Sequence, residues 1–455
     1  MSSGEHSLVE KLVEKYRKYV SFSQAFKYFP IVVARAENAR VWDITGRCYI
    51  DFLSSAATYN VGHSNREVVE AVKEQLSKFI HYCLYLYHEP VVELAELLVE
   101  VTPGRFPKKV AFGLSGGDAC DTALKASFAY TKKPGVLSYT YSYHGTTALG
   151  IAVGGSFPRE LRELMGFKSV YFVDYPDTYR CKYGVDDPEL CGEYYLSELE
   201  DVMRKVNAKE AIAALIIEPI QGDGGVLVPP KNYIAGVRKL TLEHGVVLVD
   251  DEVQTGIGRT GAMFAIEHFG VEPDLLVTAK ALGGGMPISA VVGRAEIMDA
   301  APPQSFFATS AAHALSCVAA IETIKYVLEN KLIERARQLG EYAMKRLKEL
   351  VDKYEVVGDV RGLGLMIGVD IVGDKKTKKP DRKTALKIIW RAYEKGLIMM
   401  TYGKHGNVLR IAPPLTIPKE DLDAALDIIE ESVKDALEGR VPDEVVERMV
   451  AWKTE

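Results

Sequence analysis

Apolar runs of strand length alternate with helical patterns between about residues 66 and 320. The expected strands are Lys109–Gly113, Gly135–Tyr139, Ser169–Val173, Ala213–Glu218, Val246–Asp250, Leu275–Thr278 and Ala290–Gly293. The helices expected between them include Arg66–Phe79, Pro90–Val101, Ala119–Thr131 and Ile234–His244. This alternation predicts a doubly wound α/β domain with a mostly parallel sheet.

The two ends of the chain show different patterns. Residues 8–20 have the period of an amphipathic helix, and residues 31–53 alternate like a small antiparallel sheet with a turn at Asp43–Arg47. After a long helical pattern near 314–329, short strands are expected at Val357–Leu365, Met366–Ile371 and Val408–Ile411. We therefore expect an N-terminal segment (1–62) that joins a small domain, a large domain (63–325), and a C-terminal small α+β domain (326–455).

The composition is that of an ordinary soluble protein. Of the 455 residues, 47% are hydrophobic and 26% are charged, and the net charge is −6, which argues against nucleic acid or an anionic membrane as a partner. No signal peptide or membrane-spanning stretch is evident, so we expect a cytoplasmic protein. Asn and Gln are sparse while Glu, Lys and Arg abound, a balance seen in thermophilic proteins.

The six cysteines are scattered and form no CxxC pair, so no metal site is expected. Cys181 and Cys191 flank an insert rich in Tyr, Gly and Asp, and they are close enough in sequence to form a disulfide. Free thiols are nevertheless the expectation for a reducing compartment.

Charged residues stand at the ends of two neighbouring apolar runs. Lys280 ends the run Pro273–Lys280, and Asp251 ends the run Gly245–Asp251. Open α/β sheets place their ligands at the carboxyl ends of the strands. A lysine and an aspartate so placed suit pyridoxal phosphate, since the lysine would form a Schiff base and the aspartate would keep the pyridine nitrogen protonated. Taken singly, each has a simpler explanation, as a surface lysine and a helix cap.

Three further segments are open to two interpretations each. Ser115–Asp118 follows a strand and begins a helix, which suits either a phosphate cradle or a plain N-cap. Tyr143-His144-Gly145 suits either a stacking aromatic residue or an ordinary loop. Gly256–Gly261 matches GxGxxG, but four residues separate it from the preceding strand, which disfavours nicotinamide binding. The alternative from a different functional class is a protein that binds no cofactor or binds NADP.

Together these segments resemble the class III aminotransferases, which are fold-type I pyridoxal-phosphate enzymes. The most specific stretch is Leu248–Gly256, followed at family spacing by Ala279-Lys280-Ala-Leu-Gly-Gly-Gly. The resemblance covers nearly the whole chain and implies that Lys280 is the Schiff-base lysine. It also implies that Asp251, rather than Asp250, pairs with the pyridine nitrogen.

The same resemblance implies further contacts. Val253 would pack on the ring face opposite Tyr143, Gln254 would lie near the phenolic oxygen, and Glu218 would face the substrate side. The residues expected to contact the cofactor are Gly116, Gly117, Tyr143, His144, Glu218, Asp251, Val253, Gln254, Lys280 and Thr309. Arg410 matches an arginine that binds the substrate α-carboxylate, although a strand-edge salt bridge is the simpler alternative.

The family is dimeric, so the resemblance implies a homodimer or a tetramer. Thr309 would reach from one subunit to the phosphate of its neighbour. His313 stands where the family usually has asparagine, which leaves the local geometry open.

Two reactions fit the family pattern. The first expectation is an aminotransferase that moves an amino group from an amino acid to a 2-oxo acid such as 2-oxoglutarate. Thr146 replaces an arginine typical of enzymes that use 4-aminobutyrate, so that substrate is disfavoured. The second is an amino-acid racemase or epimerase in which Lys280 and Asp223 are opposed acid/bases. The resemblance to such enzymes includes Asp223, Tyr175–Arg180 and His81-Tyr82, whereas Asp223 could also be a simple turn residue.

Overall fold

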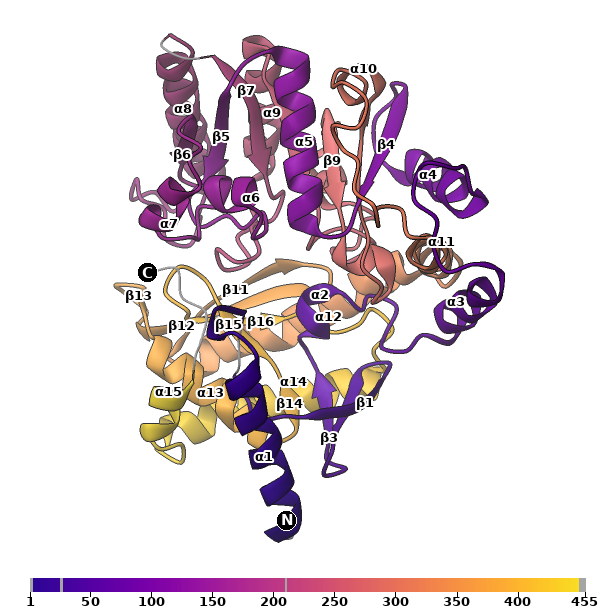
Figure 1. Ribbon diagram of the computed structural model, residues 1–455. Helices are drawn as coiled ribbons and strands as arrows, with labels where there is room; N and C mark the ends of the chain where they lie inside the picture. Colours follow the sequence, from indigo (N-terminus) through magenta and orange to yellow (C-terminus); the bar gives the residue numbers. More distant parts are fainter. Residues whose placement is uncertain (1–2, 25–27, 209–210, 450–455) are drawn as a thin grey trace.

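A seven-stranded sheet lies in the larger part of the computed structural model, which describes residues 3–24, 28–208 and 211–449 (Figure 1). Its strands are, in spatial order, β4 (Lys108–Gly113), β10 (Ser289–Arg294), β9 (Leu275–Thr278), β8 (Val247–Asp251), β7 (Ile212–Ile217), β5 (Gly135–Tyr139) and β6 (Val170–Val173). All neighbours are parallel except β10, which runs antiparallel to both β4 and β9. Every strand lies within one residue of the expected bounds, and the α/β fold-type I prediction is confirmed.

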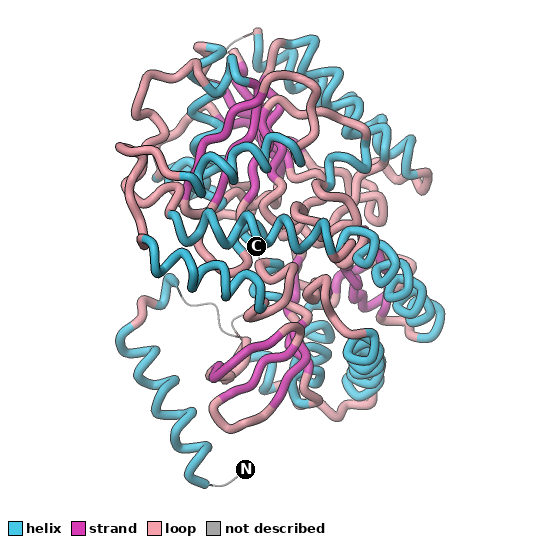
Figure 2. The backbone as a smooth tube through the Cα atoms, turned by 90° about the vertical axis from the view of Figure 1, so that its right-hand side faces the viewer, coloured by secondary structure: helices cyan, strands magenta, loops and turns pink. Residues whose placement is uncertain are grey.

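Helices cover both faces of this sheet, which is why the central strands β7 and β8 are buried along their whole length. On one face lie α5 (Gly116–Thr131) and α6 (Ala148–Val153), and on the other lie α8 (Pro188–Asn207) and α9 (Lys231–His244) (Figures 1 and 2). The remaining helices of this part are α2 (Ser54–Ala57), α3 (Arg66–Lys78), α4 (Glu89–Val101), α7 (Arg159–Leu164), α10 (Ala295–Met298) and α11 (Ala314–Glu329).

Two helices begin three residues earlier than predicted. The first turn of α5 starts at Gly116 because the Ser115 hydroxyl accepts a hydrogen bond from the Asp118 N–H at 3.3 Å. The first turn of α9 starts at Lys231 after Pro230. Neither first turn carries the apolar period on which the prediction rested.

A second, antiparallel sheet forms the smaller part. Its strands are β11 (Val357–Leu363), β12 (Met366–Asp374), β16 (Val408–Ile411) and β15 (Met400–Tyr402), with β13 (Lys379–Pro380) paired to β12. The helices beside it are α12 (Leu332–Lys353), α13 (Arg382–Glu394), α14 (Lys419–Leu437) and α15 (Glu444–Arg448).

The N-terminal segment joins this smaller part through a mixed sheet. After α1 (Ser3–Tyr19), the strands β1 (Val33–Glu37), β2 (Arg40–Asp43) and β3 (Cys48–Asp51) are antiparallel, and β14 (Leu397–Ile398) then pairs parallel to β3. Residues almost 350 positions apart thus lie side by side. The division at residues 62 and 325 stays a prediction, and none of the described helices is long and apolar enough to cross a bilayer.

One expectation about the cysteines was wrong. Cys181 and Cys191 are joined in a disulfide, with their Cα atoms 6.3 Å apart. The expectation of free thiols was based on the reducing compartment expected for the protein and not on the local geometry of the chain. The first turn of α8 brings Cys191 back beside Cys181, which is the spacing that a disulfide requires.

Candidate active site

The carboxyl ends of β4, β5, β7, β8 and β9 surround a pocket of about 190 Å³. Nine of the expected cofactor contacts line it, and each follows or ends one of these strands. They are Gly116, Gly117, Tyr143, His144, Glu218, Asp251, Val253, Gln254 and Lys280. The sheet topology alone therefore brings together residues that span more than 160 positions of the chain.

Asp251 is fixed at the floor of this pocket by three donors. Its Oδ2 atom lies 2.7 Å from Nδ1 of His144 and accepts from the Cys120 thiol at 3.4 Å, and its Oδ1 accepts from the Val253 N–H at 3.0 Å. Asp250 points to the other face of β8, as strand alternation requires, and neither of its oxygens has a partner in the described structure. The preference for Asp251 over Asp250 thus has a geometric basis.

Cys120 is a pocket residue that the sequence did not single out. It lies one helical turn after Gly116 on α5, so both face the same side, and this spacing was the available signal. Burial raises the pKa of its thiol well above the usual value, so the thiol acts as a donor to Asp251. Cys120, His144 and Asp251 also form a group of metal-ligand type among the described residues, and the absence of a metal stays a prediction.

Lys280 lies at the start of a short 3₁₀ turn directly after β9. Burial lowers the pKa of its amine to about 8, opposed by the negative charge of Asp223 and reinforced by the positive charge of Arg410. A substantial fraction of the amine is therefore neutral near pH 7.5, and the neutral form is the one that acts as a nucleophile or a base. Its φ of 37° lies in the left-handed region, a conformation that costs a non-glycine residue roughly 1–3 kcal/mol.

The end of the pocket beside α5 depends on the absence of side chains. A Cβ atom at Gly116 would lie 2.9 Å from a methyl group of Val253, and one at Gly145 would lie 2.3 Å from the Cα of Gly117. Glycine at these positions therefore lets neighbouring segments pack closely around the first turn of α5, where backbone N–H groups have no intrahelical acceptors. The N-cap at Ser115 is present as well, so the two interpretations of this segment are compatible.

Glu218 ties together two loops beside the pocket. Its Oε1 accepts from the Tyr143 N–H at 3.0 Å, and its Oε2 accepts from the Gly222 N–H at 2.9 Å. Burial raises the pKa of Glu218 to about 7, and the charges of Asp251 and Asp223 add to the rise. The loop after β7 is thereby fixed against the loop after β5.

Asp223 is buried, with 4% of its surface exposed, and is therefore not a solvent-facing turn residue. Its Oδ1 accepts a hydrogen bond from Nε2 of Gln254 at 3.0 Å. Because Gln254 lines the pocket and Asp223 does not, Asp223 lies directly behind the lining, where its charge acts on Lys280 and on the phenol of Tyr143.

Arg410, on β16 of the smaller sheet, does not line this pocket but lies near it, and its charge acts on Lys280. It is 1% exposed, and none of its three guanidinium nitrogens has an acceptor at hydrogen-bonding geometry among the described residues. The guanidinium lies 4.7 Å from the centre of the Tyr402 ring. A buried cation without an acceptor is unfavourable, and a ligand carboxylate would supply the missing acceptors. Within the part of the chain that the structure describes, Arg410 does not form the strand-edge salt bridge considered as the alternative.

Thr309 is exposed and does not line the pocket of its own chain. Its carbonyl oxygen lies 2.9 Å from Nε2 of His81, and the His81 ring stacks on that of His313 with centroids 4.7 Å apart. The segment Gly256–Gly261 is a buried turn and does not begin a helix, so it lacks the geometry of a dinucleotide site.

Comparison with known proteins agrees with this geometry. The profile of the class III aminotransferases matches residues 21–433. A leucine/methionine racemase of Thermococcus litoralis is 48% identical over 97% of this chain and 99% of its own length. An alanine/serine racemase of Pyrococcus horikoshii is 41% identical over 96% and 93%. The solved structure of an amine transaminase from an uncultivated Pseudomonas species, in its PLP-bound form, is 30% identical with a TM-score of 0.83 and covers 89% of this chain and 95% of that one.

Proposed function

Because the chain belongs to the class III aminotransferase family, whose cofactor is pyridoxal 5'-phosphate, we propose that it is a racemase or epimerase of neutral amino acids. The observation that carries the proposal is the buried Asp223, which is held beside the pocket by its hydrogen bond from Gln254, a residue that lines it. The aminotransferase, which the sequence placed first, becomes the second candidate.

The pocket has the features that the cofactor requires. Gly116 and Gly117 would hold the phosphate at the start of α5, and Asp251 would accept from the ring nitrogen. Val253 and Tyr143 would cover the two faces of the ring, and Lys280 would carry the cofactor. When bound, pyridoxal phosphate withdraws electrons from the α-carbon of an amino acid and makes the α-proton acidic.

Inversion at the α-carbon requires two acid/bases on opposite faces. In the proposal the amine of Lys280 removes or returns the α-proton on one face. Asp223, whose charge acts on Tyr143, would serve the other face. Arg410 binds the α-carboxylate and so fixes which bond of the α-carbon points toward these two groups.

The charges near the pocket favour a substrate with a single carboxylate. Lys280 is the only lysine or arginine among the described residues that line it, and Arg410 is the further cation that acts on Lys280. Thr146 occupies the position where an arginine would bind a distal carboxylate. An oxo acid with two carboxylates, such as 2-oxoglutarate, would leave one without a cation. Neutral side chains of the leucine, methionine or alanine type fit this charge pattern, in keeping with the names of the racemases above.

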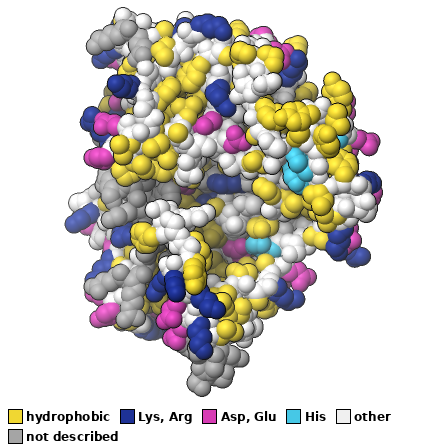
Figure 3. Space-filling view, viewed as in Figure 1, with side chains coloured by type: hydrophobic (Ala, Val, Ile, Leu, Met, Phe, Trp, Pro, Cys, Tyr) yellow, Lys and Arg dark blue, Asp and Glu magenta, His cyan; other side chains and the backbone are white. Residues whose placement is uncertain are grey.

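A second copy of the chain is the proposed partner, as a homodimer in which Thr309 completes the neighbouring phosphate site. Residues 79–87 present an exposed apolar run, in which Tyr87 is 100% and Tyr85 is 74% exposed. Tyr85 also stacks on Phe307, close in sequence to Thr309. Figure 3 shows hydrophobic side chains gathered, with a histidine among them, on the side of the molecule that carries α4. Apolar surfaces of this kind mark interfaces.

The experiment that tests the proposed reaction compares the wild-type enzyme with Asp223→Asn. Each is incubated with single neutral L-amino acids, with and without an oxo-acid acceptor. The proposal expects the substitution to abolish formation of the D-isomer while amino transfer in single turnover survives. Full D-isomer formation by Asp223→Asn would remove Asp223 from the mechanism, and product that forms only with an acceptor would favour the aminotransferase.

A further inference from the structure

The loop that carries Asp223 is closed at its base and held from both sides. Gln221 and Leu227 exchange two backbone hydrogen bonds of 3.0 Å each. On the side of the larger sheet, Glu218 accepts from the Gly222 N–H. The other side of the loop faces the smaller sheet, whose residues decide where the tip of the loop lies.

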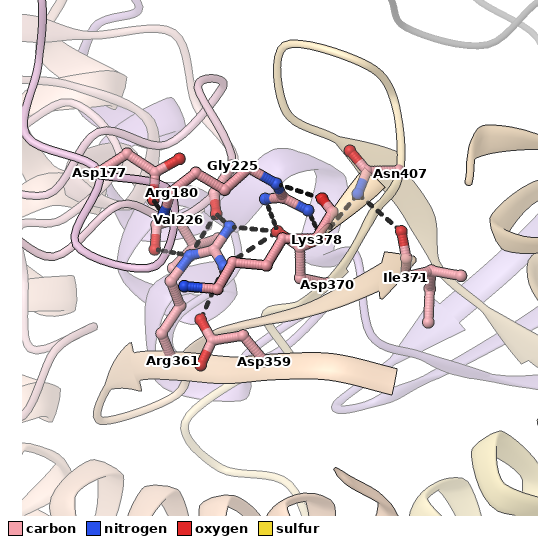
Figure 4. A network of polar contacts seen from close by, with 10 residues as sticks. All are labelled: Asp177, Arg180, Gly225, Val226, Asp359, Arg361, Asp370, Ile371, Lys378 and Asn407. Atoms are coloured by element: carbon pink, nitrogen blue, oxygen red, sulfur yellow. Dashed lines mark hydrogen bonds and ion pairs between the residues drawn. The ribbon is translucent and has the colours of Figure 1, made fainter. Parts of the chain in front are cut away.

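Two groups of the smaller part bind this loop directly. The Arg361 guanidinium, on β11, donates from Nη2 to the Gly225 carbonyl at 2.7 Å and from Nε to the Val226 carbonyl at 3.1 Å. The Gly403 N–H donates to the carbonyl of Asp223 itself at 3.0 Å. Figure 4 shows Arg361 extending from its strand toward the two carbonyls. A Cβ atom at Gly225, whose φ is 118°, would lie 3.3 Å from Nη2 of Arg361, so only glycine permits this approach without strain.

Arg361 is itself held by two carboxylates. Its Nη1 donates to Asp359 at 2.8 Å and to Asp370 at 3.1 Å. Asp370 is completely buried and also binds Arg180 through two hydrogen bonds of 2.6 and 2.7 Å, as well as the Asn407 amide at 2.7 Å. Burial alone would raise the pKa of Asp370, but Arg180 and Arg361 hold it below its usual value. The guanidinium of Arg361 is therefore fixed in position before it meets the loop.

We propose that Arg361 is a positioning residue for the inversion reaction and sets the place of Asp223 relative to the α-carbon. This inference rests on the proposed racemase function. A planar guanidinium holds two adjacent carbonyls in a fixed geometry, whereas an ammonium group on a flexible stem holds them less rigidly. A misplacement of an acid/base by about 1 Å can reduce a rate by roughly a hundredfold. Loss of Arg361 releases two of the contacts that hold the loop and so moves Asp223 but not Lys280.

The network offers a matched pair of substitutions. Arg361→Gln leaves Asp370 paired with Arg180 and Asn407, so no buried carboxylate loses all its partners. Arg180→Gln removes an arginine from the same carboxylate but touches no part of the loop, since its other hydrogen bond goes to the carbonyl of Lys378. Both variants remove hydrogen bonds to Asp370, but only Arg361→Gln also removes hydrogen bonds to the loop.

The first measurement follows the α-proton in deuterium oxide with the holoenzyme and a neutral amino acid, started from each isomer. For the isomer whose α-proton Lys280 removes, exchange with retention reports the face served by Lys280, and inversion requires Asp223 as well. We expect Arg361→Gln to lower the ratio of inversion to retentive exchange about tenfold or more. Arg180→Gln should keep that ratio within about twofold of the wild type. The ratio does not depend on the amount of folded enzyme, so a merely structural effect leaves it unchanged.

The second measurement is amide hydrogen exchange of the same holoenzymes. The amides of residues 222–227 should exchange faster in Arg361→Gln, and those in Arg180→Gln should match the wild type. Arg361→Lys is a second variant, which keeps the positive charge beside Asp359 and Asp370 but lacks the planar guanidinium. It should show a smaller fall in the ratio of inversion to retentive exchange and a smaller rise in amide exchange. If the Arg361 variants show the wild-type ratio of inversion to retentive exchange and wild-type amide exchange in residues 222–227, the inference is overturned. A wild-type enzyme that inverts nothing overturns the proposed function instead, while the amide exchange still decides whether Arg361 holds the loop.

Discussion

Arg410 and Lys280 are the two residues whose surroundings make most sense with a ligand present. Arg410 is a buried cation with no acceptor at hydrogen-bonding geometry in the described structure, and Lys280 is an amine held in a left-handed backbone conformation. Natural proteins keep such unfavourable groups where function requires them. Each therefore predicts a variant whose stability and activity change in different ways.

Replacement of Arg410 by methionine should leave stability unchanged or higher while activity falls. The apolar side chain removes an unpaired buried charge, whereas a substrate carboxylate loses its partner, which costs about 3 kcal/mol or roughly a hundredfold in kcat/KM. Thermal unfolding and steady-state kinetics of Arg410→Met check both parts. A fall in Tm of more than about 5 °C with near-normal kcat/KM would show that the arginine is structural.

Lys280 predicts a pH dependence of stability in the cofactor-free protein. Its pKa is lowered to about 8 in the folded state from 10.5 in the unfolded chain, so between these values the unfolded chain binds more protons. The free energy of unfolding should therefore rise with pH across this window, by up to about 1.4 kcal/mol per unit, and the penalty is present in full below pH 8. Denaturant unfolding of cofactor-free wild type and Lys280→Met at several pH values isolates the contribution of this lysine. Parallel stability curves for the two proteins would contradict it.

The sequence predicted the residues at the strand ends but not their electrostatic surroundings. Lys280 and Asp251 could be found because a charged residue at the end of an apolar run is visible in the pattern. The spacing of Cys120 from Gly116 could have indicated a pocket residue, but neither its hydrogen bond to Asp251 nor the contacts of Arg361 could be predicted, because each joins elements more than 100 residues apart. The burial of Asp223 likewise depends on tertiary packing and not on its local Asp-Gly sequence.

At the scale of elements, the strands were predicted more accurately than the connections. The buried strands β5, β9 and β16 consist mostly of apolar residues, so their ends coincide with changes in polarity. The pairing of β14 with β3 was not predicted because two residues carry no periodicity. The disulfide between Cys181 and Cys191 was considered but not favoured, because the expectation of free thiols used the compartment in place of local geometry.

Removal of this disulfide should destabilise the protein. Replacement of both Cys181 and Cys191 by alanine is expected to lower the free energy of unfolding by about 2–4 kcal/mol, because the unfolded chain regains the entropy of an open loop. Cys48→Ala, at a free and exposed cysteine, is the control and should change little. Alkylation of the unfolded but unreduced protein should modify Cys48, Cys83, Cys120 and Cys317 and spare the other two cysteines. Modification of all six would contradict the pairing.

At the scale of the whole molecule, the proposed site depends on both sheets and on a second copy of the chain. Arg410 and Arg361 come from the smaller sheet, and Lys280 and Asp251 come from the larger one. The two parts therefore have to stay packed together for the substrate groups to face the cofactor groups. Thr309, by contrast, is exposed on its own chain and needs a neighbour to take part.

Charges introduced into the exposed run at 79–87 should separate the proposed dimer. Tyr85→Glu combined with Tyr87→Glu places two carboxylates in an apolar interface, which is unfavourable for association. Sedimentation should show the wild type as a dimer and the variant as a monomer with weaker cofactor binding. Leu164→Glu, at an equally exposed position on α7, should remain a dimer. A variant that keeps both the dimer and its cofactor would exclude this surface from the interface.

The central claim is that this protein inverts an amino acid and does not require an amino acceptor. The most direct measurement incubates the purified holoenzyme with a single neutral L-amino acid, without any oxo acid, and follows both isomers by chiral chromatography. We predict that the D-isomer accumulates until the two isomers are near equal amounts, and that little oxo acid forms. Absence of the D-isomer, with turnover only after an oxo acid is added, would contradict the claim.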